Sequence, residues 1–313
     1  MKAAQISEYG DPSVVRLVDI DQPTVGDGQV VVEVYASSIN PFDSTVRAGH
    51  VKDLMPLSLP VTLGGDIAGT VTAVGADVTS VVDGDMVYGQ ANAVAGNSGA
   101  FAEYARTNAT EVAKLPNNVD FKEAASLPLV GVSALQAITE HLEVTADQKL
   151  FINGAAGGIG LIAIQIAKHL GAHVAATATG QGVQAVTDAG ADEVIDYKTQ
   201  DFKELLSDYD AVFDLVGGET FDTSLHVLKR GGKALSMAAV SPTSALEAEL
   251  GVTVMSQMTR VTTEWLDELT KLVEAGVVTP HIDQVFTLDD IVEAFQAKED
   301  ESVIGKIVVD IHQ

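Results

Sequence analysis

Cysteine is absent from the 313 residues of this chain. Its absence excludes disulfide bonds, thiolate catalysis, iron–sulfur clusters and zinc sites with cysteine ligands. Basic residues are also few, because 18 Lys and Arg stand against 44 Asp and Glu, which gives a net charge of −26. Nucleic acids and anionic membranes attract basic surfaces, so we expect neither as a partner.

Long hydrophobic runs are missing as well. The most apolar window, Ile159 to Ala167, is about nine residues long and contains Gln165, whereas a membrane span needs roughly twenty apolar residues. The first residues also lack an apolar stretch of signal-peptide length. We therefore expect a soluble protein, most simply a cytoplasmic one.

The pattern of apolar residues changes along the chain. Residues 1–122 contain short valine-rich runs separated by turns, which is typical of a small β barrel or sandwich. Further on, apolar strands alternate with helical patterns; the predicted strands are Lys149–Asn153, His173–Ala178, Glu193–Asp196, Ala211–Val216, Lys233–Ala238 and Thr253–Ser256. This alternation predicts a doubly wound parallel sheet of the Rossmann type. We predict an α/β protein in which a Rossmann domain, 123–266, is inserted into a β-rich domain formed by 1–122 and 267–313.

Two finer expectations concern this α/β segment. A helical pattern from Glu123 to Leu142 is expected to break at Pro128 and Gly131. Strand Thr253–Ser256 is expected at the edge of the sheet, where a bare apolar strand would be an aggregation hazard. We therefore expect a homodimer joined through this edge.

A glycine-rich turn follows the first strand of the alternating series. It reads Gly154-Ala155-Ala156-Gly157-Gly158-Ile159-Gly160 and leads directly into a helix. In this context the backbone approaches a pyrophosphate, and the N–H groups and positive dipole end of the helix face that anion. Gly157 would give the close approach, and Gly160 would let the helix pack on the strand. The alternative is a glycine turn that binds no ligand.

The segment after the second strand bears on the choice of dinucleotide. NAD sites usually place an Asp or Glu there to bind the ribose 2′-hydroxyl. Residues 175–182 include Thr177 and Thr179 but no acid, so nothing repels a 2′-phosphate and NADPH is favoured. No Lys or Arg occurs there either, and Tyr197 and Lys198 are the nearest candidates for a phosphate clamp. Lys198 could equally be a solvated loop lysine.

Motifs in both domains resemble the medium-chain dehydrogenases/reductases, and within them the zinc-free quinone oxidoreductase (zeta-crystallin-like) group. The resemblance runs nearly end to end and is carried by Ser38-Ile39-Asn40-Pro41-Phe42-Asp43, Arg47-Ala48-Gly49, residues 63–71, 84–88, 99–104, 124–129, 154–160, 213–218 and 305–308. It implies a GroES-like catalytic domain built from both chain ends, a Rossmann domain between them, and an active site in the cleft.

The resemblance also implies that no catalytic zinc is bound. Zinc-dependent relatives have Cys where this chain has Asn40, and Gly-His-Glu where it has Gly64-Gly65-Asp66. Without the metal, zinc-alkoxide oxidation of alcohols is not expected. What remains is hydride transfer from the nicotinamide to an acceptor such as a quinone or a conjugated enone, with the protein supplying position and excluding water.

Site residues follow from the same resemblance. It implies that Asn40, Phe42, Asp43 and Ser44 line the nicotinamide side, with Asn40 bonded to the cofactor or to a developing oxyanion. We predict Asn40, Phe42 and Asp43 as catalytic. Asn40 could instead be a turn residue, and Asp43 could form an i,i+4 ion pair with Arg47.

Further cofactor contacts are implied in both domains. These residues are Ser133, Ala156, Gly158, Ile159, Val216, Ala238, Ala239, Val240, Met255 and Lys306. Those on strands could equally be sheet core, and Ser133 could pack on a helix surface. Relatives usually have Arg where this chain has Ile304, which leaves Lys306 as the cation of the tail.

Three functions are compatible with these features. The leading one is an NADPH-dependent quinone reductase, and the second is an NADPH-dependent alkenal/enone reductase. The third is an NADPH-binding structural or partner-binding protein with little turnover. The loops that would shape a substrate pocket, around 54–60 and 240–250, carry no motif that separates the first two.

Overall fold

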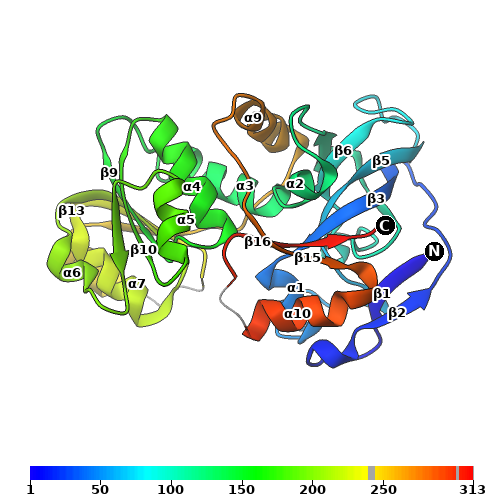
Figure 1. Cartoon of the computed structure of the whole chain (residues 1–313), viewed down its shortest axis with the longest axis horizontal. Coiled ribbons are helices and arrows are strands. Elements are labelled where there is room, and N and C mark those ends of the chain that lie inside the picture. The colour runs from blue at the N-terminus through cyan, green and yellow to red at the C-terminus, as the bar shows by residue number, and fades with distance from the viewer. Residues whose placement is uncertain (239–243, 301–302, 313) are drawn as a thin grey trace. The chain divides into compact units, whose positions relative to one another are not determined.

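The computed structural model (Figure 1) describes residues 1–238, 244–300 and 303–312. The chain divides into two compact units. The first comprises Met1–Leu129, Val261–Ala275 and Pro280–Gln313, and the second comprises Val130–Arg260 and Gly276–Thr279. Helix α9 (Thr263–Glu274) therefore lies in the first unit as a whole, whereas the predicted boundary at 266/267 falls inside it.

The first unit is built on two sheets. A small one has the order β2-β1-β4, and a larger one has the order β15-β16-β3-β5-β6-β8, with β7 also paired to β3. The strands are β1 (Lys2–Ile6), β2 (Arg16–Asp19), β3 (Gln29–Ile39), β4 (Val61–Thr62), β5 (Asp66–Val74), β6 (Met86–Gln90), β7 (Tyr104–Asn108), β8 (Val112–Lys114), β15 (Ile282–Thr287) and β16 (Lys306–Asp310). The C-terminal strand β16 runs antiparallel to β3, with Ile307 opposite Ile39. This pairing brings Lys306 to the end of β3.

Helices α1 (Pro41–Arg47) and α10 (Ile291–Asp300) contribute to the core of this unit. Phe101 and Phe295 are fully buried there and meet edge to face, with ring centroids 5.8 Å apart. Full burial of such a side chain contributes roughly 1.5–3 kcal/mol to stability. The same core contains Ile39, two residues before the first residue of α1, and this burial fixes the chain where the helix begins.

The second unit contains a six-stranded parallel sheet with the order β11-β10-β9-β12-β13-β14. Its strands are β9 (Lys149–Asn153), β10 (His173–Ala178), β11 (Glu193–Asp196), β12 (Tyr209–Asp214), β13 (Leu228–Ser236) and β14 (Thr253–Ser256). The chain starts at β9, moves outward to β11, and then returns to continue from β12 to β14. The order therefore reverses between β9 and β12, which is where doubly wound sheets bind ligands.

Helices connect these strands. Helix α4 (Gly158–His169) packs on β9 and β10, and α5 (Gly182–Asp188) packs on β10 and β11 (Figure 1). The predicted fold class, a Rossmann sheet plus a separate β-rich domain, is confirmed. Among the described residues, strand β14 lies at one edge of this sheet, where the sequence predicted it.

Some elements differ from the sequence prediction. Pro128 does separate α2 (Phe121–Ala125) from α3 (Pro128–Leu135), but Gly131 lies inside α3, which continues into a π-helix (Gln136–His141). Glycine in a helix costs about 1 kcal/mol relative to alanine, and burial of its neighbours on α3 outweighs that cost. None of the described helices is both long and apolar enough to cross a membrane.

Candidate cofactor and active sites

The glycine-rich turn joins the carboxyl end of β9 to helix α4. Gly154 adopts a positive φ of 79°, and Gly157 is the N-cap of the helix. The first bond of the helix runs from the Leu161 N–H to the Gly157 carbonyl at 3.0 Å. The N–H groups of residues 158–160 precede that bond and have no carbonyl one turn earlier to accept them. The start of α4 can therefore donate to an anion.

Three of the four glycines of the turn differ in what surrounds them. A Cβ on Gly160 would lie 2.4 Å from the carbonyl oxygen of Ala155, and a Cβ on Gly154 would lie 2.6 Å from Val216 Cγ2. Backbone packing therefore requires glycine at position 160, and the left-handed φ of 79° favours glycine at position 154. A Cβ on Gly157 would meet no heavy atom within 4 Å. The turn thus fits a pyrophosphate group, with Gly160 packed against the strand and open space beside Gly157.

A chain of buried polar side chains ties the turn to the neighbouring strands. Thr177 Oγ1 accepts the Gly154 N–H and donates to Asn153 Oδ1, both at 2.8 Å. Asn153 Nδ2 donates to Asp214 Oδ1, and Asp214 Oδ2 accepts the hydroxyl of Ser236, again at 2.8 Å. Asp214 Oδ2 also accepts the Gly217 N–H at 2.8 Å. This network, Asn153–Thr177–Asp214–Ser236, holds the backbone of two loops at the carboxyl edge of the sheet.

Sequence reasoning missed most of this network. Thr177 was predicted to contact the cofactor; its hydroxyl also accepts the Gly154 N–H and donates to Asn153. The signal that could have revealed the network is a polar residue at the end of each apolar strand: Asn153, Asp214 and Ser236 are the last residues of β9, β12 and β13.

Other predicted cofactor residues lie around the same edge. Val216 is 52% exposed and lies against Gly154, while Ala238 donates its N–H to Ser236 Oγ at 3.2 Å. Ala156, Gly158, Ile159, Thr179 and Met255 are all half-buried. Ser133 is buried and shares a 2.7 Å hydrogen bond with Thr259 Oγ1. Ala239 and Val240 lie outside the described residues.

The candidate phosphate clamp lies beyond the end of β11. Tyr197 is 54% exposed and Lys198 is exposed. The Lys198 N–H donates to Asp196 Oδ1 at 3.1 Å. Asp196 pairs in register with Ala178 at the end of β10. An acid therefore does lie beside the end of the second strand, contributed by the adjacent strand rather than by residues 175–182.

In the first unit, four residues form a buried polar cluster, here called the Asn40 cluster: Asn40, Asp43, Asp66 and Lys306. The Asn40 N–H donates to Asp43 Oδ2 at 2.8 Å, which fixes the first turn of α1. Asn40 Nδ2 donates to Asp66 Oδ2 at 2.8 Å, and Asn40 Oδ1 accepts from Lys306 Nζ at 2.6 Å. Lys306 Nζ also donates to the Ile39 carbonyl at 2.9 Å and lies 3.7 Å from Asp66 Oδ2.

The cluster perturbs its own ionisation. The pKa of Asp43 is raised to about 7, chiefly by burial and also by the neighbouring Asp66 carboxylate, while the Asn40 N–H and the Lys306 ammonium oppose the rise. Burial lowers the pKa of Lys306, against the attraction of Asp66 and Asp43. One ammonium and two carboxylates share a site with little access to water. In such an arrangement burial and the neighbouring carboxylate favour the neutral form of Asp43.

The remaining residues predicted on the nicotinamide side lie on α1. Phe42 is half-buried and packs against the core, and Ser44 Oγ is buried with no hydrogen-bond partner among the described residues. The alternative that Asp43 forms an ion pair with Arg47 is wrong. Arg47 Nη2 binds Glu299 at 2.7 Å instead, because α10 brings a carboxylate to the guanidinium while the Asp43 carboxylate accepts the Asn40 N–H.

Lys306 was predicted to contact the cofactor. Its Nζ is buried and bonded to Asn40 and Ile39 within the protein. Within the part of the chain that the structure describes, no group of three or more His, Cys, Asp or Glu side chains could hold a metal ion. The two decisive positions for zinc in the resemblance hold Asn40 and Gly65.

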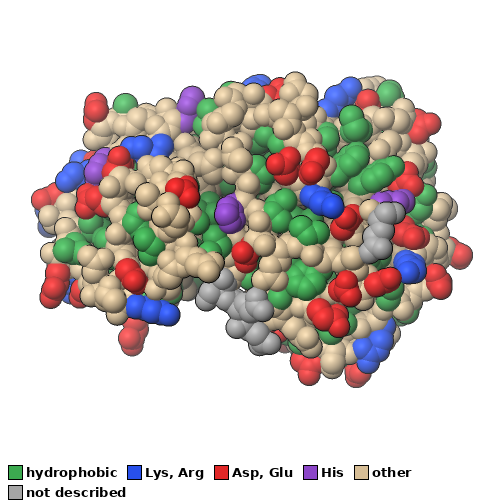
Figure 2. Space-filling model, in the orientation of Figure 1, with side chains coloured by type: hydrophobic (Ala, Val, Ile, Leu, Met, Phe, Trp, Pro, Cys, Tyr) green, Lys and Arg blue, Asp and Glu red, His purple; other side chains and the backbone are tan. Residues whose placement is uncertain are grey.

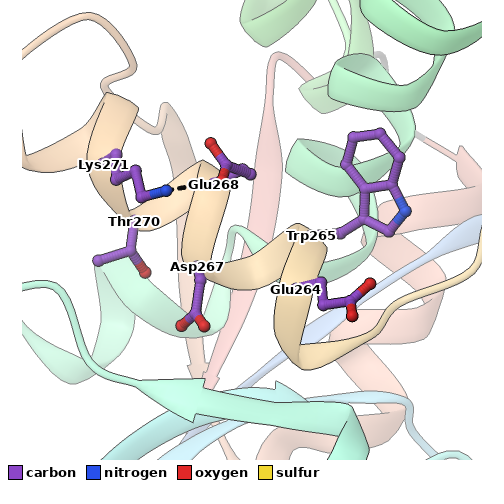
Figure 3. Close-up of a pocket in the computed structure, with 6 residues that line it drawn as sticks. All are labelled: Glu264, Trp265, Asp267, Glu268, Thr270 and Lys271. Atoms are coloured by element: carbon purple, nitrogen blue, oxygen red, sulfur yellow. Dashed lines mark hydrogen bonds and ion pairs between the residues drawn. The ribbon is translucent and has the colours of Figure 1, made fainter.

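A depression on the first unit lies apart from these residues. It is lined by Glu264, Trp265, Asp267, Glu268, Thr270 and Lys271 of α9, with Lys271 Nζ paired to Glu268 Oε1 at 2.6 Å (Figure 3). None of the predicted site residues takes part in it. Acidic side chains are also spread across the face seen in Figure 2, as the net charge requires.

Comparison with known proteins places both units in one family. A model described as "Alcohol dehydrogenase GroES-like domain" matches residues 26–117, and one described as "Zinc-binding dehydrogenase" matches residues 189–309. The chloroplastic NADPH-dependent alkenal/one oxidoreductase of Arabidopsis thaliana is 34% identical over 99% of this chain and 79% of its own length.

Solved structures agree with this relationship. The quinone oxidoreductase from Coxiella burnetii matches with a TM-score of 0.92 and 32% identity, covering 100% of this chain and 99% of that one. The Escherichia coli quinone oxidoreductase, complexed with NADPH, matches with a TM-score of 0.89 and 29% identity, covering 99% of this chain and 100% of that one. The chain therefore belongs to the medium-chain dehydrogenase/reductase family, as its motifs predicted.

Proposed function

We propose that this protein is an NADPH-dependent oxidoreductase that reduces quinones without a metal ion. The observation that carries the proposal is the glycine turn before α4, where packing requires Gly160, a positive φ favours Gly154, and Gly157 faces open space. A turn of this kind at the switch point of a doubly wound sheet fits a dinucleotide. The quinone oxidoreductases among its structural neighbours support the choice of acceptor.

NADPH is the cofactor that the sequence predicts and that the comparisons support. One structural neighbour is complexed with NADPH, and the Arabidopsis relative is NADPH-dependent by name. In this chain, Tyr197 and Lys198 are exposed next to the carboxyl edge of the sheet. We propose that they contact the 2′-phosphate, with Lys198 offering the positive charge.

When bound, NADPH supplies a hydride. The residues of this chain then have three tasks. The N–H groups at the start of α4 bind the pyrophosphate, and the polar network from Asn153 to Ser236 holds the loops that carry them. Asn40 donates its free Nδ2–H to the oxygen of the nicotinamide carboxamide or of the acceptor. A quinone takes its proton from water or from a nearby hydroxyl, so no metal is needed.

An alkenal or enone is the second candidate acceptor, because the Arabidopsis relative acts on such compounds by name. The same hydride chemistry would then reduce a carbon–carbon double bond. Steady-state oxidation of NADPH with a panel of quinones and a panel of enals decides between the two. Tight binding of NADPH with no turnover on either panel would instead favour a structural or partner-binding protein.

Assembly and location are part of the same proposal. Strand β14 lies at the sheet edge, and Met258 just beyond it is 80% exposed. We propose that a second copy of this chain covers the edge, since an open apolar strand invites pairing. Light scattering at micromolar concentration should give the mass of a dimer, and the mass of a monomer would contradict this proposal.

The cytoplasmic location also stays a proposal; the Arabidopsis relative is chloroplastic.

A further inference from the structure

Within the Asn40 cluster, the side-chain amide of Asn40 forms hydrogen bonds that a residue serving only to start a helix would not require. The Asn40 backbone is bonded to Asp43, through its N–H and its carbonyl, and its side chain is bonded at two points: Nδ2 donates to Asp66 and Oδ1 accepts from Lys306. Each partner is buried and carries an ionisable group. The bond from the Asn40 N–H to the Asp43 carboxylate belongs to the capping box at the start of α1. The bonds from Asp66 and Lys306 act on the side-chain amide alone.

Asp66 is itself held in place from several sides. Its Oδ2 accepts Ser38 Oγ at 3.0 Å, and its Oδ1 accepts Gln90 Nε2 at 3.0 Å and the Leu129 N–H at 3.1 Å. These donors come from β3, from β6 and from the start of α3. The carboxylate therefore cannot turn to follow Asn40, so Asn40 must adopt the orientation that Asp66 accepts.

The charges permit one amide orientation only. With Oδ1 on the ammonium and Nδ2 on the carboxylate, both contacts are favourable and charge-assisted. A flipped amide would place its NH₂ group against the Lys306 ammonium and its oxygen against the Asp66 carboxylate. The ammonium also polarises the amide carbonyl, which strengthens the remaining Nδ2–H as a donor.

We propose that Lys306 and Asp66 are positioning residues that lock the Asn40 side chain and make its free Nδ2–H a fixed hydrogen-bond donor. This inference rests on the proposed function for the role of Asn40. It assigns Lys306 a task different from a direct contact with the cofactor: Lys306 acts through Asn40. The group that Asn40 binds is then an acceptor oxygen, such as a carbonyl of the nicotinamide or of a quinone.

A double-mutant cycle tests the coupling. Lys306→Met removes the ammonium with little change in volume, and Asn40→Ala removes the amide. Each single variant should lower kcat/KM for the quinone about tenfold or more, as loss of a charge-assisted bond does. In the Asn40→Ala background, Lys306→Met should add less than about threefold. Effects that multiply fully would show that Lys306 acts independently and would overturn the proposal.

A spectroscopic measurement tests the lock without activity. In ¹⁵N-labelled protein, the Nδ2 resonances of Asn40, assigned by their loss in Asn40→Ala, should be resolved and protected from exchange with water. Lys306→Met should shift them and raise their exchange rate at least tenfold; unchanged resonances would refute the proposal. If Lys306→Met does not fold, Lys306→Gln, which removes the charge, is measured in its place and should likewise shift the resonances. Lys271→Met, on the exposed face of α9, is the control and should change neither readout.

These measurements separate the two levels of the proposal. Wild-type protein that turns over no quinone or enone would remove the proposed function, while the resonances would still decide whether Lys306 orients Asn40. Active wild-type protein with an additive cycle would leave the function in place and remove the positioning role.

Discussion

Gly157 and Gly160 are three residues apart at the start of α4, and alanine at these positions should have different effects. Gly160→Ala should lower the stability of the protein, whereas Gly157→Ala should weaken NADPH binding. At Gly160, the added Cβ would lie 2.4 Å from the Ala155 oxygen and 2.5 Å from the Ala155 Cα. Both atoms belong to the backbone, so the loop or the helix must move. Overpacking of this kind costs about 1–3 kcal/mol, of which alanine recovers up to about 1 kcal/mol through helix propensity.

At Gly157, the added Cβ meets no atom within 4 Å, and the backbone is extended, with φ −81° and ψ 171°, which any residue adopts. Loss of glycine at an N-cap costs a few tenths of a kcal/mol to about 1 kcal/mol, and lower entropy of the unfolded chain offsets it by about 0.4–1 kcal/mol. Gly157→Ala should therefore leave stability nearly unchanged. It should weaken NADPH binding about ten- to a hundredfold, because the methyl group enters the space proposed for the pyrophosphate.

Thermal unfolding with and without NADPH, together with fluorescence titration of NADPH, measures both effects. Without cofactor, Gly160→Ala should lower the unfolding midpoint by about 3–8 °C and Gly157→Ala by about 2 °C or less. NADPH should raise the midpoint of wild type much more than that of Gly157→Ala. If Gly157→Ala binds NADPH as tightly as wild type does, the assignment of the turn to the pyrophosphate is refuted. A fully stable Gly160→Ala would refute the packing argument.

Three further predictions concern charge and metal. Lys198→Ala should raise KM for NADPH about tenfold, the lower end for loss of a phosphate contact, and leave KM for NADH nearly unchanged; an equal effect on both rejects the clamp. Because the pKa of Asp43 is raised, the folded protein keeps a proton on this carboxyl group that the unfolded chain releases. The contribution of Asp43 to the free energy of unfolding therefore falls as pH rises from about 4 to about 7. Asp43→Asn should thus be more stable relative to wild type at pH 8 than at pH 4, and a difference independent of pH contradicts this. Purified protein should contain no stoichiometric zinc, which metal analysis can contradict by finding about one per chain.

The Rossmann unit could be predicted in detail because its signals are local. An apolar run bounded by turns marks each parallel strand, and β9, β10, β11 and β14 begin and end where the sequence predicts. The glycine spacing also placed the turn before α4. Strand β15 was missed because it alternates half-buried with exposed residues and depends on pairing with β16.

The polar interactions could not be predicted in the same way. Arg47 was expected to pair with Asp43 because they lie one helical turn apart, but α10 supplies Glu299 from the far end of the chain. Lys306 looked like a free cation in the tail, yet the pairing of β16 with β3 buries it beside Asn40 and Asp66. Contacts between segments far apart in the chain decide both cases, and the pattern of a single sequence does not reveal such contacts.

We propose that this chain transfers hydride from NADPH to a quinone. The steady-state rate of NADPH oxidation with a panel of quinones, set against a panel of enals and repeated with NADH, tests this proposal. We predict turnover of at least one quinone, a higher kcat/KM for quinones than for enals, and a preference for NADPH over NADH of about tenfold. A preference for NADH, or no quinone turnover by protein that binds NADPH tightly, would contradict it.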